Sequence, residues 1–393
     1  MSEIADRLSS SPIDTQPRLR VAAPTTLMLE TRLVSGAEWD RTIADFDEVC
    51  QEQLYAFAVA RWPSVKQEPM LFLLDGEIVG GALMMVQPLP LRLGHIAVSK
   101  WAPMLKDISR PDADAIHAGM VEAMIADYAD KRGQMISVLP AASITPVNGA
   151  YARLEARGFQ RGSQLLFPSR YIVNLRLDDA AQRKSLHQKW RYHLNKSEKV
   201  GLSFEHAGPE RLPEFDVLYA AMTDRKQFAD HSAYDSIESL MTLDDALRPE
   251  LFFVRHEGNI VAGALIFKAG DRAVYLYGAT NDQALPLRAG YFMHWHIIRW
   301  LRDNTRAGWY DLGGTDGFQG LHQFKKGMVG DAGVIEPVPP VANYASNRLA
   351  FLLGTGAFAA RDLVYHIKRV LDGWRNPKTK ATQVKAGADE SGQ

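Results

Sequence analysis

Two stretches of the chain share one pattern of apolar and polar positions. Residues 71–83 (LFLLDGEIVGGAL) and 252–265 (FFVRHEGNIVAGAL) each contain an apolar run, a turn dipeptide and a second apolar run. That pattern is typical of a β-hairpin, with turns centred on Gly76 and Gly258. Identity at one constant offset continues past the turn into the strand positions. Tandem duplication therefore explains the pattern better than the general likeness of any two hairpins.

Each hairpin is followed by a helix, a strand and a second helix, and the second helix is expected at 148–159 in the first half and at 318–328 in the second. A helical stretch (112–133) and a short apolar strand (135–140) follow the first hairpin. A strand (273–280), a helix (291–308) and a further strand (309–314) follow the second. This order predicts an α/β (α+β) fold, in which each half is a mixed, mostly antiparallel sheet flanked by helices.

The repeat also predicts where the domains begin and end. A C-terminal helix is expected after the second domain, interrupted in its first part by Gly354 and Gly356. The predicted segments are a flexible N-terminal segment (1–24), a first domain (25–170), a second domain (171–344), a C-terminal helical segment (345–376) and a disordered tail (377–393).

The composition of the chain excludes several kinds of functional site. The chain has 393 residues, 23% of them charged, and a formal net charge of −1, so any anion-binding site must be local. Its single cysteine, Cys50, excludes an internal disulfide framework and a cysteine-rich zinc site. The N-terminus lacks the apolar core of a signal peptide, and no stretch has the length of a membrane span. These features predict a soluble, cytoplasmic protein.

A glycine-rich stretch, residues 310–330 (YDLGGTDGFQGLHQFKKGMVG), is the first candidate site. Gly313 and Gly314 can adopt positive φ or let a ligand reach the backbone. Asp311, at the end of a strand, either organises the loop or accepts a proton. Lys325 and Lys326 are successive on a helix and point in different directions, so one of them can face a cleft.

A basic helix, within residues 180–201 (AAQRKSLHQKWRYHLNKSEKVG), is the second candidate site. Leu186, Trp190 and Leu194 form an apolar stripe at helical spacing. The cations around the stripe are either a solvated face or a phosphate-binding surface. They include Lys189, Arg191 and Lys196, together with Arg183, Lys184 and Lys199.

Several catalytic motifs are absent. His294 and His296 diverge on a helix, so they make a poor metal pair. The chain has no HExxH motif, no GxSxG nucleophile elbow and no P-loop. The sequence therefore predicts neither a metal nor a covalent nucleophile.

Three stretches resemble the Fem-type (FemABX-like) aminoacyltransferases of the GNAT superfamily, whose members consist of two tandem GNAT-like domains. Residues 189–201 (KWRYHLNKSEKVG) are similar to the basic motif that opens the family's second domain. Residues 275–282 (YLYGATND) and 289–315 are similar to its strand, helix and strand. Residues 320–330 (GLHQFKKGMVG) are similar to its Phe-Lys segment.

The resemblance implies a reaction in which an amine attacks an activated acyl carbonyl and an amide forms. It implies an aminoacyl-tRNA donor, an amine on a peptidoglycan precursor as acceptor, and no tightly bound cofactor. Lys325 would then sit at a substrate phosphate or stabilise developing charge, and Arg225 would be a second phosphate ligand. Tyr277 is either a hydrogen-bonding group of the cleft or a core tyrosine.

The sequence also departs from the family. No extended stretch corresponds to the helical arm that some Fem enzymes carry. The GNAT pyrophosphate motif Q/R-x-x-G-x-G/A is absent, and only Arg288 and Gly290 stand near its place. Two alternatives stay open: an acyl-CoA-dependent N-acetyltransferase acting on a small molecule or polysaccharide, and a non-enzymatic binding module. The basic, apolar C-terminal helix either packs on its own domain or contacts the inner face of a membrane.

Overall fold

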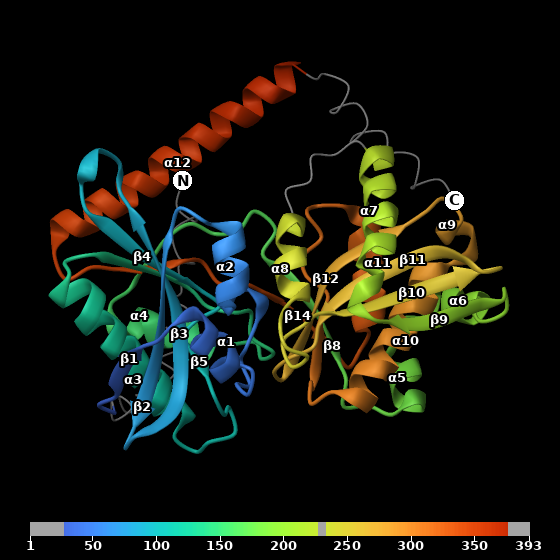
Figure 1. The fold of residues 1–393 in the computed structure, drawn as a ribbon, viewed down its shortest axis with the longest axis horizontal. Helices are drawn as coiled ribbons and strands as arrows, with labels where there is room; N and C mark the ends of the chain where they lie inside the picture. Colours follow the sequence, from blue (N-terminus) through green and yellow to red (C-terminus); the bar gives the residue numbers. More distant parts are fainter. Residues whose placement is uncertain (1–26, 227–232, 376–393) are drawn as a thin grey trace, which may run out of the picture.

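The computed structural model describes residues 27–226 and 233–375, and it describes their side chains except those of residues 225–226 and 362–375. Two sheets lie side by side, each with helices on its faces (Figure 1). Among the described residues, no helix has the length and apolar character to cross a bilayer.

The first sheet has the strand order β1-β2-β3-β4-β6-β15-β7, with β5 paired to β3. Its strands are β1 (Glu30–Leu33), β2 (Lys66–Leu74), β3 (Glu77–Pro88), β4 (His95–Lys100), β5 (Met104–Leu105), β6 (Met135–Leu139), β7 (Gln160–Arg161) and β15 (Ala342–Tyr344). Its helices are α1 (Gly36–Ile43), α2 (Tyr55–Arg61), α3 (Ala113–Met124) and α4 (Gly149–Arg157).

The second sheet has the order β14-β8-β13-β12-β11-β10-β9. Its strands are β8 (Ser169–Asn174), β9 (Leu202–Ala207), β10 (Glu250–His256), β11 (Asn259–Phe267), β12 (Arg272–Thr280), β13 (Trp309–Asp311) and β14 (Val334–Pro337). The remaining helices are α5 (Asp179–Ser185), α6 (Gln188–Ser197), α7 (Leu212–Lys226), α8 (Ile237–Met241), α9 (Ala284–Leu287), α10 (Ala289–Asn304), α11 (Gln319–Val329) and α12 (Arg348–Arg375).

The structure confirms the hairpin repeat and the α/β fold class. Both hairpin turns have two successive residues with positive φ, at 52° and 84° in the first and 49° and 82° in the second. A register shift follows Phe72 in the first hairpin and Val254 in the second. The offset that relates Gly76 to Gly258 also relates these two residues, so the repeat extends to the irregularity itself. Each sheet contains one parallel pair, β4 with β6 and β12 with β13.

The two halves exchange their last strands. β8 follows β7 along the chain but lies between β13 and β14 of the second sheet. β15 follows β14 but lies between β6 and β7 of the first sheet. Residues 342–344, which the sequence places at the end of the second domain, therefore belong to the first sheet. Each sheet needs a strand from the other half to satisfy its backbone hydrogen bonds.

One apolar core is continuous between the halves. Trp39 and Phe46 from the first half share a buried cluster with Phe215, Phe253 and Phe267 from the second. In Figure 1, α1 and α2 face α7 and α8 between the sheets. Each Å² of apolar surface buried in this shared cluster contributes roughly 25 cal/mol, so the cluster stabilises the contact between the halves.

The C-terminal helix α12 is continuous, and it corrects the expectation that Gly354 and Gly356 interrupt it. A Cβ at Gly354 would lie 2.4 Å from the Met135 side chain, so this glycine permits close packing on β6. Phe351 and Phe358 pack against a small core beneath the start of the helix. Tertiary packing on the first sheet thus compensates for the poor helix propensity of glycine.

Candidate functional site

Lys325 lies beneath the glycine loop that joins β13 to α11. Its Nζ donates hydrogen bonds to the carbonyl oxygens of Leu312, at 2.6 Å, and Gly314, at 2.5 Å. The residue is 6% exposed, whereas Lys326 is exposed, so the two successive lysines do point in different directions. The loop path requires positive φ at Gly313, as the sequence suggests, and also at Asp316.

The environment of Lys325 favours its neutral form. Burial, and the nearby positive charge of Arg170, lower the pKa of Lys325 to about 8. The ammonium therefore binds the loop at neutral pH and still exchanges its proton readily. A lysine with such a pKa is suited to chemistry in which charge develops and then disappears.

Asp311 is anchored by Arg170, a residue that the sequence did not indicate. The Nε of Arg170 lies 3.0 and 3.1 Å from the two carboxylate oxygens of Asp311, which also accepts the N–H of Gly313 at 2.8 Å. Arg170 is on β8, the exchanged strand, and its guanidinium lies 5.5 Å from the ring centre of Trp101 in the first half. Asp311 thus organises the loop, and its ion pair joins the loop to both halves.

The buried His294 and Tyr310 and the partly buried Tyr275 lie near Lys325. The Nδ1 of His294 is 3.1 Å from the hydroxyl of Tyr310, and the His294 ring is 5.0 Å from that of Tyr275. The Nζ of Lys325 is 6.0 Å from the Tyr275 ring. Burial, and the charge of Lys325, lower the pKa of His294 to about 3, so its imidazole is neutral at physiological pH.

Tyr277 lies apart from Lys325, in the core between the halves. Its ring is 5.1 Å from that of Tyr234, and burial raises its pKa to about 12. A register shift in the β11–β12 pairing puts Tyr275 and Tyr277 on opposite faces of the sheet, although residues two apart normally share a face. Of the two candidate roles, the structure favours that of a core tyrosine.

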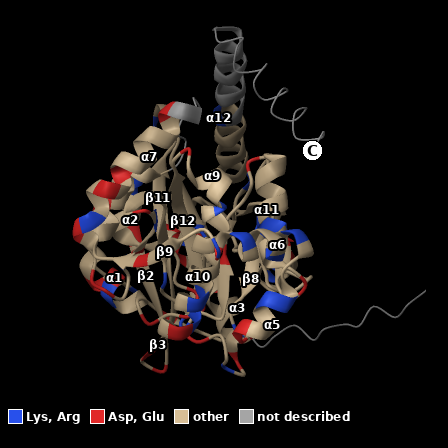
Figure 2. Ribbon diagram, turned by 90° about the vertical axis from the view of Figure 1, so that its right-hand side faces the viewer, with Lys and Arg blue, Asp and Glu red and all other residues tan. Residues whose placement is uncertain are grey.

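Leu186, Trp190 and Leu194 are all buried, but only Trp190 and Leu194 lie on the basic helix α6, because Leu186 stands in the turn between α5 and α6. Lys189 and Lys196 are exposed. The Nη1 of Arg191 donates to the carbonyls of Lys184, at 2.7 Å, and Leu186, so this residue holds the α5–α6 turn. Figure 2 shows lysines and arginines on both α5 and α6.

A group of cations surrounds His193 on α6. The pKa of His193 is lowered by burial and by the charges of Arg288, Lys189 and Lys196. Its Nδ1 is buried without a hydrogen-bond partner. Arg288 has a φ of 59° immediately before α10, whose N-terminus adds a partial positive charge. We call Lys189, Lys196, Arg288 and His193 the cation cluster.

Aromatic side chains connect the cation cluster to Lys325. Tyr291 on α10 lies 4.9 Å from the ring of His193 and 4.9 Å from that of Phe324. Phe324 precedes Lys325 and lies 5.6 Å from His294. The cluster and the glycine loop are thus two ends of one packed region formed by α6, α10 and α11.

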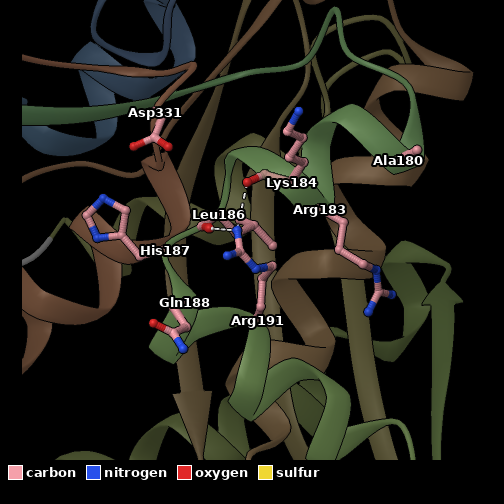
Figure 3. A pocket seen from close by; sticks show the side chains of 8 residues that line it. All are labelled: Ala180, Arg183, Lys184, Leu186, His187, Gln188, Arg191 and Asp331. Atoms are coloured by element: carbon pink, nitrogen blue, oxygen red, sulfur yellow. Dashed lines mark hydrogen bonds between the residues drawn. The ribbon is translucent and has the colours of Figure 1, made fainter.

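A separate open pocket of about 650 Å³ lies at the α5–α6 turn (Figure 3). Three cations of the basic stretch, Arg183, Lys184 and Arg191, line it, and the Arg191 guanidinium donates to the turn carbonyls. The lining residues are Ala180, Arg183, Lys184, Leu186, His187, Gln188, Arg191 and Asp331. The side chain of Arg225, at the end of α7, lies outside the described residues. Among the residues that are described, no group of His, Cys, Asp and Glu has the arrangement of a metal site.

Comparison with known proteins agrees with this architecture. Residues 181–326 match the acetyltransferase (GNAT) domain family. A stretch of 77 residues is 34% identical to the lipid II:glycine glycyltransferase of Staphylococcus aureus, and it spans 18% of this chain and 18% of that enzyme.

Two solved structures share the fold. The crystal structure of FemX has a TM-score of 0.67 at 18% identity, over 83% of this chain and all of FemX. The C-terminal domain of a putative lysylphosphatidylglycerol synthetase from Agrobacterium fabrum has a TM-score of 0.51 at 14% identity, over 82% of this chain and 96% of that one.

The two sheets are thus arranged as two tandem GNAT-like domains, and residues 181–326 of the second half match the acetyltransferase (GNAT) domain family. The likeness to FemX extends over most of the fold, whereas the sequence likeness to the glycyltransferase is confined to 77 residues.

Proposed function

We propose that this protein is an N-acyltransferase that forms an amide between an aminoacyl ester and an amine acceptor of the cell envelope. The observation that carries the proposal is the buried Lys325, whose pKa is about 8 and whose Nζ holds the glycine loop. The partial likeness to an enzyme of lipid II supports a peptidoglycan precursor as the acceptor.

The cation cluster supports a phosphate-rich donor. Lys189 and Lys196 are exposed, and both raise the local positive potential at His193 together with Arg288. Such a group attracts phosphates by charge-assisted hydrogen bonds and the helix dipole of α10. The phosphates of an aminoacyl-tRNA acceptor end would bind there, with the ester directed towards the loop.

The chemistry at the loop needs few groups. The acceptor nitrogen bonds to the ester carbonyl carbon, the carbon–oxygen ester bond breaks, and the amine proton passes to the departing alcohol oxygen. Lys325 would supply positive charge for the oxygen that becomes anionic between these events. The Arg170–Asp311 pair would keep the loop in one position while the reactants align.

An acyl-CoA donor is the second candidate, and the match to the acetyltransferase domain family favours it. The phosphates of coenzyme A would then bind at the same cation cluster. The missing Q/R-x-x-G-x-G/A motif argues against this donor, because those glycines let the backbone approach a pyrophosphate.

Ligand-induced thermal shifts distinguish the two donors. A ligand at 100 times its Kd stabilises the native state by about 2.7 kcal/mol. We expect aminoacyl-tRNA to raise Tm for the wild type and to raise it much less for Lys189→Ala/Lys196→Ala. Lys199→Ala, which removes an exposed cation just beyond α6, is the matched control. Stabilisation by coenzyme A alone would favour the second candidate, and stabilisation by neither would refute both.

A further inference from the structure

The β3–β4 hairpin ends in an exposed apolar tip. Leu91 is 90% exposed and Leu93 is 48% exposed, with Arg92 between them. Leu91 and Arg92 both have positive φ, at 57° and 58°, which is unfavourable for residues with a side chain. The two exposed leucines on this strained turn contribute nothing to the core of the protein itself. The tip is therefore suited to contact with another molecule or surface.

Helix α12 brings two further leucines to the same end of the molecule. Leu349 is 67% exposed and Leu352 is 68% exposed, and they are three positions apart, so they share one face of the helix. The opposite face packs on the base of the hairpin, where Phe351 meets Ile96. In Figure 1 the tip of the hairpin rises beside the start of α12. The hairpin and the start of the helix, each with two exposed leucines, therefore lie at the same end of the molecule.

The two segments that carry these leucines are basic, and an acidic residue near them is Asp130, which accepts a hydrogen bond from the Ser346 hydroxyl just before α12. No aspartate or glutamate occurs between Glu77 and Asp107, or between Glu336 and Asp362. Arg92 and Arg348 are both exposed beside the leucines. A chain with a net charge of −1 thus has one end that is apolar and basic.

The cations continue along α12. Burial lowers the pKa of Lys100, and the positive charges of Arg61 and Arg361 lower it further, against the opposing charge of Glu52. Arg361 on α12 is therefore close to the cations at the ends of α2 and β4. Only an anionic partner complements this surface, because a symmetric contact with a second copy would place arginines against arginines.

We propose that this surface docks the protein on a bilayer that contains anionic lipid. We call it the leucine rim: Leu91, Leu93, Leu349 and Leu352, with Arg92 and Arg348. The leucines would enter the boundary between headgroups and acyl chains, while the arginines bind lipid phosphates. This inference does not depend on which donor or acceptor the protein uses.

Vesicle co-sedimentation of the full chain tests the leucine rim. We expect the protein to pellet with phosphatidylcholine vesicles containing about 30% phosphatidylglycerol, and only weakly with phosphatidylcholine alone or at high salt. Leu91→Ser/Leu93→Ser should lower the partition coefficient at least about tenfold. The control variant Val147→Ser/Leu285→Ser removes two apolar side chains outside the leucine rim, which are 69% and 74% exposed. It should leave binding within about twofold of the wild type.

A second measurement uses Leu91→Trp, which adds a fluorophore at a position where the wild-type side chain is 90% exposed. Its emission should shift to the blue with anionic vesicles and be quenched by brominated acyl chains. Each of three results would overturn the proposal. The wild type could stay in the supernatant, the hairpin variant could pellet as the wild type does, or the fluorescence of Leu91→Trp could remain unquenched. Lipid-free self-association that the serine variants abolish would overturn it in favour of a dimer interface.

Discussion

Replacing Lys325 with methionine removes the ammonium but keeps most of the side-chain length. In the wild type the ammonium makes two hydrogen bonds to loop carbonyls. Hydrogen bonds to charged groups contribute about 1.5–3 kcal/mol each, so the pair contributes about 3–6 kcal/mol. Burying the charge opposes this: the fall in the pKa of Lys325 from 10.5 to about 8 corresponds to about 3 kcal/mol.

The two contributions nearly cancel, so Lys325→Met should change the free energy of unfolding by only about 0–3 kcal/mol. Catalysis has no such compensation. Removing one preorganised charge from a reacting centre costs about 100- to 1,000-fold in turnover. We therefore expect a variant that folds and barely turns over.

The assay is amide formation, followed by mass spectrometry, with whichever donor stabilises the wild type, alongside denaturant unfolding of the same samples. Lys326→Met is the matched control, because Lys326 is the exposed neighbour on the same helix. The reasoning fails if Lys325→Met folds and keeps more than about a tenth of the activity, or if Lys326→Met loses as much.

Three further predictions follow from the same contacts. Between pH 8 and 10.5, Lys325 holds more protons in the unfolded chain than in the folded chain. The free energy of unfolding of the wild type, relative to that of Lys325→Met, should therefore rise with pH across that range. If urea unfolding gives a difference that does not change with pH, the lowered pKa is contradicted. Arg170→Met should destabilise the protein by about 3–5 kcal/mol because it leaves Asp311 buried and unpaired, and Arg170→Met/Asp311→Asn should recover part of the loss in thermal unfolding. A fragment ending at residue 168 lacks the strand that separates β6 from β7, so it should be insoluble or show no cooperative unfolding by circular dichroism, whereas a stable fragment would mean that the strand exchange is dispensable.

Much of the fold could be predicted because it depends on local patterns. Each hairpin has its own turn dipeptide, and the burial of Trp190 and Leu194 on α6 follows from helical spacing. The different orientations of Lys325 and Lys326 follow from helix geometry. The strand exchange could not be predicted in this way, since a short strand has no local signal that says which of two similar sheets it joins.

The site was less predictable because its contacts are long-range. Arg170 meets Asp311 across 141 positions of sequence, and it meets Trp101 only because β8 is exchanged. That Tyr277 and Tyr275 lie on opposite faces of the sheet depends on a register shift that the alternation of side chains cannot reveal. His294 was considered only as a metal ligand, although a polar residue on the apolar face of a helix that packs on a sheet is a signal for a buried contact.

The most direct test of the account is a crystal structure of the protein with a stable amide analogue of the aminoacyl-tRNA 3′ end. The account predicts phosphates within hydrogen-bond distance of Lys189, Lys196 or Arg288, and the acyl carbonyl next to the glycine loop above Lys325. An analogue that binds instead in the open pocket at the α5–α6 turn, with no contact to that loop, would contradict it.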